Sequence, residues 1–184
     1  MAQSSGALVL VVGGSGVGKD TVLNGARTAL AGDARIVFPR RIITRAPDAT
    51  EDHDAVTPDE FERLSASGAF ALSWGAHGLR YGIPRAIDEH LAAGSAVVSN
   101  VSRTIVPHAR AAYPRTFVVE ITVPPEVRAA RIAARGRESL ADASARLARD
   151  VGRDHAADHV LDNSGSPDIA IGAFVALLRA LADR

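Results

Sequence analysis

The feature that most constrains the fold is an apolar run that ends directly in a glycine-rich loop. Residues 7–12, ALVLVV, have the pattern of a strand covered on both faces in a parallel sheet. Residues 13–19, GGSGVGK, fit G-x-x-x-x-G-K, and residues 21–30 have the pattern of a helix. Because such a loop turns backbone N–H groups inward and a helix N-terminus favours anions, this order predicts a loop that binds nucleotide phosphates.

The lysine content of the chain supports the same interpretation. Of the 21 lysine and arginine residues, only Lys19 is a lysine. A compact ammonium reaches between phosphates in a way that the planar guanidinium does not, so Lys19 is predicted to bridge the β- and γ-phosphates of ATP. The alternative is a glycine-rich turn with a chance lysine. The predicted nucleotide-binding residues are Gly13, Gly14, Ser15, Gly16, Val17, Gly18, Lys19, Asp20 and Thr21.

The loop departs from the common pattern immediately after its lysine. Asp20 stands where serine or threonine usually offers a hydroxyl to Mg²⁺, and Thr21 follows it. A carboxylate is a hard oxygen ligand, so Asp20 and Thr21 are the predicted Mg²⁺ ligands. The alternative is that Asp20 only favours the first turn of its helix.

Length and charge limit the classes of partner. A chain of 184 residues with 47% hydrophobic residues is expected to form one globular domain. Basic and acidic residues number 21 each, so we expect no nucleic-acid and no membrane partner. The absence of cysteine fits a reducing compartment, and no signal-type segment is recognised near the start, so a cytoplasmic protein is expected.

Further apolar runs predict the rest of the sheet. Residues 96–98, 116–123 and 159–161 alternate with helical stretches, which is typical of a doubly wound parallel α/β sheet of the P-loop type, with helices on both faces. Thr57-Pro58 and Ser166-Pro167 have the pattern of helix starts. The predicted helix stops are Gly68, Gly94 and Gly136.

The predicted domain has three parts. The core comprises residues 1–39, 94–124 and 151–184, residues 40–93 form an acceptor-binding insert, and residues 125–150 form a helical lid. The lid is rich in arginines at helical spacing, which could stabilise charge on a transferred phosphoryl group or could be ordinary solvated surface. These arginines are Arg128, Arg131, Arg135, Arg146 and Arg149.

Beyond the loop, the chain resembles the guanylate kinase family. The matching landmarks are Thr44-Arg45, residues 56–61, Gly68 to Phe70, Trp74 and Tyr81-Gly82. The resemblance implies a P-loop kinase that uses ATP and Mg²⁺. It also implies that Arg45 and Tyr81 hold the acceptor phosphate, and that Arg131 and Arg146 act in catalysis together with Lys19.

The chain departs from that family at the positions that recognise guanine. Leu72-Ser73 replaces the glutamate that reads the base, His53 replaces a tyrosine, and Ile83 replaces a hydroxyl residue. Without these hydrogen-bonding groups, GMP is not expected to be the acceptor. Arg41 replaces a serine and would share one face of an extended segment with Arg45, which suits an acceptor with more phosphate charge.

In these departures the chain resembles another family, the ribose 1,5-bisphosphate phosphokinases of phosphonate breakdown. The resemblance rests on Gly18-Lys19-Asp20 and on residues 40–45, 51–54 and 76–82. It implies ATP-dependent phosphorylation of ribose 1,5-bisphosphate at its 1-phosphate, with Arg41, Arg45 and Tyr81 holding this phosphorylated sugar. The products would be 5-phospho-α-D-ribose 1-diphosphate and ADP. The alternatives are another nucleoside monophosphate kinase and a binding module without catalysis.

Several polar residues keep two interpretations each. Residues 51–54, EDHD, fit either sugar or metal binding or a solvated loop, and Asn100 fits either a contact to metal through water or a loop cap. Arg103 would meet an acceptor phosphate or a surface partner. His155 and His159 are expected to be surface residues, and Asn163 would border the adenine or turn the chain.

Overall fold

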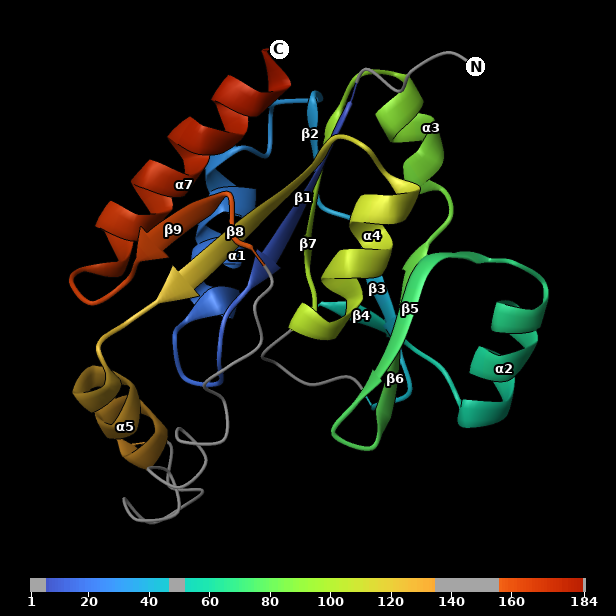
Figure 1. The fold of residues 1–184 in the computed structure, drawn as a ribbon, viewed down its shortest axis with the longest axis horizontal. Coiled ribbons are helices and arrows are strands. Elements are labelled where there is room, and N and C mark those ends of the chain that lie inside the picture. Colours follow the sequence, from blue (N-terminus) through green and yellow to red (C-terminus); the bar gives the residue numbers. More distant parts are fainter. Residues whose placement is uncertain (1–5, 47–51, 135–155, 184) are drawn as a thin grey trace.

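Two sheets organise the protein, one parallel with five strands and one mixed with four (Figure 1). The structure is a computed structural model that describes residues 6–46, 52–134 and 156–183. The five-stranded sheet has the order β2-β7-β1-β8-β9, and all its ladders are parallel. Its strands are β1 (Ala7–Val12), β2 (Ile36–Val37), β7 (Ala96–Asn100), β8 (Thr116–Thr122) and β9 (His159–Asp162).

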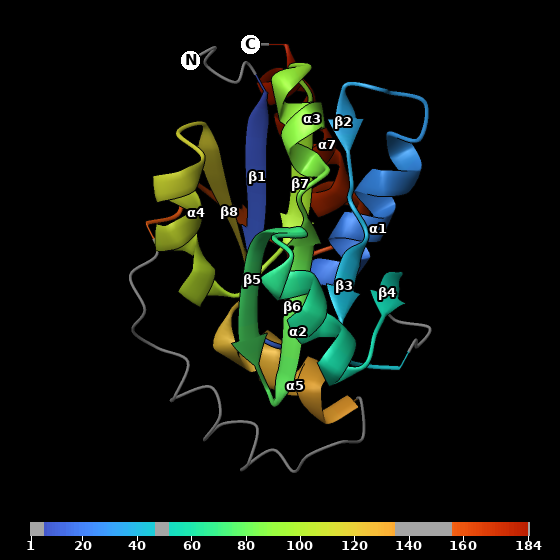
Figure 2. The same ribbon diagram turned by 90° about the vertical axis from the view of Figure 1, so that its right-hand side faces the viewer.

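Helices cover both faces of this sheet. Helices α1 (Lys19–Ala29) and α7 (Pro167–Ala182) pack on one face. The other face carries α3 (Ile87–Ala92), the short helix η1 (Arg103–Ile105) and α4 (Val106–Ala112). In Figure 2, α3 lies in front of the strands and α7 behind them. The predicted doubly wound parallel sheet is therefore confirmed.

Strand β1 lies at the centre of the sheet, and all its residues are buried. Val9 and Val11 face the cluster beneath α1 and α7, whereas Leu8 and Leu10 face the cluster beneath α3 and α4. An apolar side chain is therefore required at every position of β1, which explains its unbroken apolar run.

The four-stranded sheet lies within residues 40–93 and has the order β4-β3-β6-β5. Its strands are β3 (Arg41–Ile43), β4 (His53–Ala55), β5 (Phe70–Ala76) and β6 (Leu79–Pro84), and helix α2 (Pro58–Ala66) follows β4 in the chain. Leu72, Trp74 and Ile83 of this sheet join the core cluster beneath α3 and α4. The two sheets are thus packed together through apolar side chains.

The helix signals in the sequence are confirmed with one difference. Thr57 caps α2, because its hydroxyl accepts a hydrogen bond from the Glu60 N–H at 3.2 Å. Helix α7 begins at Pro167 as predicted, but its N-cap residue Ser166 makes no side-chain capping bond. Gly68 and Gly94 follow α2 and α3 with positive φ angles of 73° and 89°. Gly136 lies outside the described residues.

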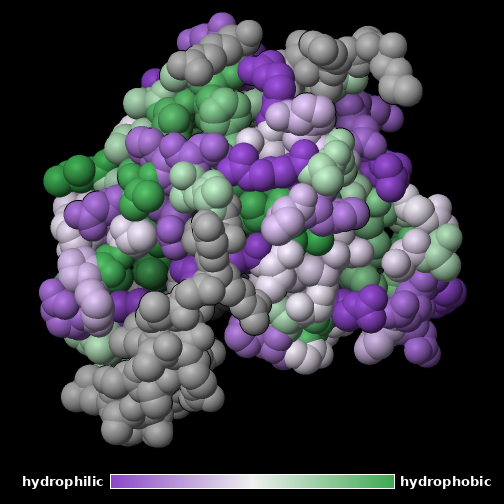
Figure 3. Space-filling model, viewed as in Figure 1, coloured by the Kyte–Doolittle hydropathy of each residue, from purple (hydrophilic) through white to green (hydrophobic). Residues whose placement is uncertain are grey.

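The described part of the predicted lid is helix α5 (Pro125–Ala134), which lies beyond the end of β8 (Figure 1). Among the described residues, no helix has the length and apolar character needed to cross a membrane. Figure 3 shows hydrophilic and hydrophobic side chains interspersed over one face of the molecule. Within the part of the chain that the structure describes, the large exposed apolar side chains are Val160 on β9 and Ile169 on α7.

Candidate active site

The phosphate loop leaves β1 and enters α1 through backbone that only glycine adopts easily. Gly13, Gly16 and Gly18 have φ angles of 150°, 85° and 87°. A Cβ atom on Gly16 would lie 2.7 Å from Cγ1 of Ile132, and one on Gly18 would lie 2.5 Å from Nδ2 of Asn163. The loop glycines therefore serve both backbone conformation and the close approach of neighbouring elements.

Lys19, the first residue of α1, folds its side chain back over this loop. Its Nζ donates hydrogen bonds to the carbonyls of Gly13 at 2.8 Å and Gly14 at 3.1 Å. Burial lowers the pKa of Lys19 to about 8; Asp20 opposes this shift, and nearby arginines add to it, Arg103 most strongly among them. The ammonium thus lies in a strongly basic region that favours an anion.

Asp20 and Thr21 are exposed in the first turn of α1. Asp20 Oδ1 accepts a hydrogen bond from Asn100 Nδ2 at 3.3 Å, so the carboxylate lies beside the end of β7. Among the described residues, no group of three or more His, Cys, Asp or Glu side chains is arranged to hold a metal. A Mg²⁺ ion held by one carboxylate and substrate phosphates needs no such group, so Asp20 and Thr21 fit this ion.

Arg41 of β3 is buried beside the same strand end. Its Nη1 donates to the Asn100 carbonyl at 2.8 Å, and only 8% of the residue is exposed. Its guanidinium lies 5.9 Å from the ring centre of Trp74 and 5.3 Å from that of Tyr81, whose rings are stacked. Asn100 therefore contacts both the first turn of α1, directly after the phosphate loop, and the buried arginine.

Arg45 and Tyr81 lie in the same region of the smaller sheet. Tyr81 is half-buried in β6, paired with Ile43 of β3, and Arg45 is half-buried just beyond β3. Arg41 and Arg45 are expected from the sequence to lie on one face of an extended segment. Strand β3 ends at Ile43, so the alternation of side chains along the strand does not reach Arg45. The structure brings Arg41 and Tyr81 into contact.

The positions predicted to have lost guanine recognition are mostly apolar and enclosed. Leu72 and Ile83 are opposite each other in the β5–β6 ladder, and both are fully buried in the core. His53 is 4% exposed, and its Nε2 makes a hydrogen bond with the Arg45 carbonyl at 3.1 Å. Leu72 and Ile83 provide packing instead of hydrogen bonds, and His53 supports the backbone at Arg45.

The acidic residues beside His53 are engaged by arginines. Arg40 Nη2 lies 3.1 Å from an oxygen of Asp52 and 3.0 Å from one of Asp54, and Arg27 lies 3.8 Å from Asp52. These ion pairs are largely exposed, so their contribution to stability is small. Asp52 also lines a cleft together with Asp20 and Arg41, and Glu51 lies outside the described residues.

Helix α5 packs directly on the phosphate loop. Arg128 Nε donates to the Ser15 carbonyl at 2.7 Å, and Arg131 Nη2 donates to the Asn163 carbonyl at 2.9 Å. Ile132 is buried beside Gly16. Both described arginines of the predicted lid are thus placed at the loop, whereas Arg135, Arg146, Arg149 and also His155 lie outside the described residues.

Sequence reasoning missed two contacts of the loop region. Asn163, which is 2% exposed, donates from Nδ2 to the Val17 carbonyl at 2.8 Å and so braces the loop. Arg103 pairs with Glu120 of β8 at 3.1 Å. Two features of the sequence could have indicated these contacts. Asn163 directly follows the last strand, and Glu120 is a carboxylate within the apolar run of β8. His159 is exposed on β9, in agreement with its predicted surface position.

Comparisons with known proteins agree with this geometry. The chain is 54% identical over 175 residues to the ribose 1,5-bisphosphate phosphokinase PhnN of Methylobacterium radiotolerans, covering 95% of this chain and 98% of that protein. It is 54% identical over 174 residues to the PhnN of Acidiphilium cryptum, covering 95% and 93%. The chain belongs to the ribose 1,5-bisphosphate phosphokinase family. No family model matches the chain.

Solved structures with a similar fold identify the fold class of the chain. The guanylate kinase of Anaplasma phagocytophilum has a TM-score of 0.72 at 20% identity, covering all of this chain and 90% of that one. A gluconokinase of Sinorhizobium meliloti has a TM-score of 0.52 at 21% identity, covering 98% and 95%. These likenesses show the P-loop kinase fold alone. The predicted fold class and the predicted family resemblance are both confirmed.

Proposed function

We propose that the protein transfers the γ-phosphoryl group of ATP to the 1-phosphate of ribose 1,5-bisphosphate. The products are 5-phospho-α-D-ribose 1-diphosphate and ADP. The observation that carries this function is the contrast within the smaller sheet. Arg41 is buried beside the end of β7, while Leu72-Ser73 and Ile83 stand where a glutamate and a hydroxyl residue would read guanine, and both Leu72 and Ile83 are enclosed in the core. These features favour an acceptor that is held through its phosphates over one that is read through a guanine base.

On the nucleotide side, the loop of residues 13–18 surrounds the phosphates of ATP with backbone N–H groups. Lys19 exchanges its hydrogen bonds with the Gly13 and Gly14 carbonyls for contacts with the β- and γ-phosphates. Asp20 and Thr21 are the residues that would hold Mg²⁺, which would neutralise phosphate charge.

On the acceptor side, Arg41, Arg45 and Tyr81 hold the phosphorylated sugar. The aromatic rings of Trp74 and Tyr81 orient the Arg41 guanidinium, and the Asn100 carbonyl fixes one of its nitrogens. This arrangement gives Arg41 a defined plane for a bidentate contact with phosphate oxygens. Tyr81 adds a hydroxyl donor.

The reaction follows from positioning and charge. An oxygen of the 1-phosphate bonds to the γ-phosphorus while the bond from that phosphorus to the bridging oxygen breaks, and the electron pair remains on ADP. A phosphate oxygen is already ionised near neutral pH, so no general base is needed. Arg131 stabilises charge on the transferred group, and the same role for Arg146 stays a prediction from the sequence.

An acceptor panel tests this function. ATP is supplied with ribose 1,5-bisphosphate, GMP, AMP or ribose 5-phosphate, and products are separated by chromatography. We expect 5-phospho-α-D-ribose 1-diphosphate to form at a kcat/KM far above those for the other acceptors. A preference for GMP would show a nucleoside monophosphate kinase instead, and nucleotide binding without transfer to any acceptor would favour a binding module.

A further inference from the structure

The pair formed by Arg103 and Glu120 has no part in the nucleotide and acceptor roles described above. Arg103 begins η1, just beyond β7, and its Nη2 donates to Glu120 Oε1 at 3.1 Å. The side chains are 18% and 20% exposed. Removing two such charges from water costs free energy, and apolar replacements of buried pairs are often neutral, so stability alone is a weak reason for this pair.

The pair lies at the strand end from which the phosphate loop starts. Glu120 is opposite Val12 in the β1–β8 ladder, and Val12 is the last residue of β1 before the loop. Strands β7 and β8 flank β1 on its two sides. The Arg103–Glu120 contact therefore spans the carboxyl end of β1, where ligands bind in open α/β sheets.

Arg103 also belongs to the group of cations around Lys19. Among the arginines that lower the pKa of Lys19, Arg103 has the largest effect, followed by Arg128 and Arg41. Arg128 and Arg41 donate to main-chain carbonyls, whereas Arg103 is held by a carboxylate. Several cations that converge in this way repel one another and favour a multiply charged anion between them.

We propose that Arg103 is a further catalytic residue, which contacts the phosphoryl group during its transfer, and that Glu120 positions it. This inference rests on the proposed function. As the bond to the acceptor oxygen forms and the bond to ADP breaks, negative charge spreads over the oxygens of the transferred group. The planar guanidinium of Arg103 donates to these oxygens, and no proton changes place. Glu120 fixes the plane of the guanidinium by binding Nη2.

Substitutions of both partners test the two roles. R103Q is expected to lower kcat about 100-fold with little change in the KM for ATP, because a donor to the transferred group is lost. R103K retains the charge without the fork, so its kcat should lie between those of R103Q and the wild type. E120Q should lower kcat about tenfold, as expected for a residue that acts through another. The double variant should then match R103Q.

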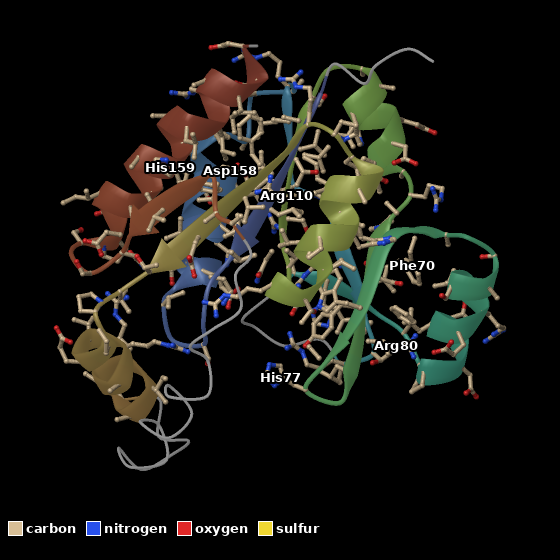
Figure 4. All side chains as sticks on the ribbon, in the orientation of Figure 1. Phe70, His77, Arg80, Arg110, Asp158 and His159 are labelled. Carbon is tan, nitrogen blue, oxygen red and sulfur yellow. The ribbon has the colours of Figure 1, made fainter. Side chains whose placement is uncertain are left out.

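Arg110 provides the matched control. It forms a comparable ion pair, 2.7 Å from Asp158, between α4 and the residue before β9 (Figure 4). R110Q should lose this pair and retain wild-type kcat. If R103Q has the same kcat as R110Q, Arg103 is not catalytic. If the losses of R103Q and E120Q multiply in the double variant, Glu120 does not act through Arg103.

A binding measurement separates this inference from the choice of acceptor. ADP alone and ADP with Mg²⁺ and aluminium fluoride, a mimic of the transferred group, are titrated calorimetrically without acceptor. R103Q should bind ADP like the wild type and bind the mimic more weakly, whereas equal affinities for the mimic would overturn the catalytic role. Failure of the proposed function would appear separately, as no turnover of ribose 1,5-bisphosphate by the wild type.

Discussion

At the scale of single residues, Lys19 is the residue for which the sequence and the structure point most directly to phosphate binding. It is the only lysine of the chain, and its Nζ lies against the Gly13 and Gly14 carbonyls at the point where phosphates would bind. Burial lowers the pKa of its ammonium, Asp20 opposes this shift, and the charges of three arginines add to it. These contacts make its charge available to an anion and make that charge sensitive to pH.

Replacing Lys19 with methionine tests its assigned role. K19M should reduce kcat/KM for ATP by at least about 100-fold, because a cation that stabilises the transferred charge is lost. Folding should change little, since methionine fills similar space and the bonds of the lysine to described residues are those to two loop carbonyls. Steady-state kinetics measure the loss, and circular dichroism checks the fold. Near wild-type turnover in K19M would remove Lys19 from the mechanism.

The lowered pKa of Lys19 predicts a pH dependence of nucleotide binding. In the free protein the amine loses its proton above about pH 8, whereas bound phosphates favour the charged ammonium. ATP binding should therefore take up a proton at pH 9, and affinity should fall up to about tenfold per pH unit above pH 8. Calorimetry in buffers of different ionisation enthalpy measures this uptake. K19M should show neither effect, and equal proton uptake in K19M would assign the titration to another group.

At the scale of elements, the smaller sheet is the part that we propose to bind the acceptor. The guanidinium of Arg41 on β3 lies 5.9 Å from the ring centre of Trp74 on β5 and 5.3 Å from that of Tyr81 on β6, so three strands together set its position. The tip of the β5–β6 hairpin carries His77, which is exposed and has a positive φ of 53° (Figure 4). The position of the Arg41 guanidinium therefore depends on strand pairing as well as on residue identity.

Removing the Arg41 side chain should affect one substrate more than the other. R41S is expected to raise the KM for ribose 1,5-bisphosphate about 10- to 100-fold, the loss expected when a charge-assisted hydrogen bond disappears. The KM for ATP should change much less, because Lys19 and the loop remain. R40S, at an exposed neighbour that pairs with Asp52 and Asp54, is the control and should retain both constants. Equal losses for both substrates in R41S would contradict its acceptor role.

Asn163 tests whether the element after β9 supports the phosphate loop. Asn163→Asp removes the Nδ2 donor and places a carboxylate against the Val17 carbonyl. We expect the free energy of unfolding to fall by about 1–3 kcal/mol, because a buried acceptor loses its partner. ATP affinity should also fall, since the loop is displaced and a negative charge is added. Denaturant unfolding and nucleotide titration measure both. Unchanged stability would show that this contact does not brace the loop.

The sequence predicted the fold better than it predicted the contacts of the site. Strands, loop and helix starts were recognisable because they depend on local patterns, such as the apolar run of β1 and the cap at Thr57. Contacts such as Asn163 with Val17 and Arg128 with Ser15 join residues 146 and 113 positions apart. No local pattern specifies such partners in an arginine-rich chain, so they became visible only in three dimensions.

At the scale of the whole molecule, the smaller sheet and helix α1 are both bonded to the end of β7. Asn100 donates from its side chain to Asp20 beside the phosphate loop, and its carbonyl accepts from Arg41 of the smaller sheet. Leu72, Trp74 and Ile83 anchor that sheet to the core cluster beneath α3 and α4. Occupation of one substrate site can therefore affect the order of the other through contacts that already exist.

This connection predicts that the two substrates stabilise the protein together. A non-hydrolysable ATP analogue at about 100 times its Kd should add about 2.7 kcal/mol to the free energy of unfolding. With ribose 1,5-bisphosphate also present, the increase should exceed the sum of the separate effects, by about 1–3 kcal/mol for typical coupling between sites. Thermal unfolding with each ligand and with both measures this excess. N100A removes the contact to Asp20 and leaves the carbonyl contact to Arg41, so it should reduce the excess while the effect of each ligand alone changes less. Strictly additive effects in the wild type would show that the two sheets bind their substrates independently.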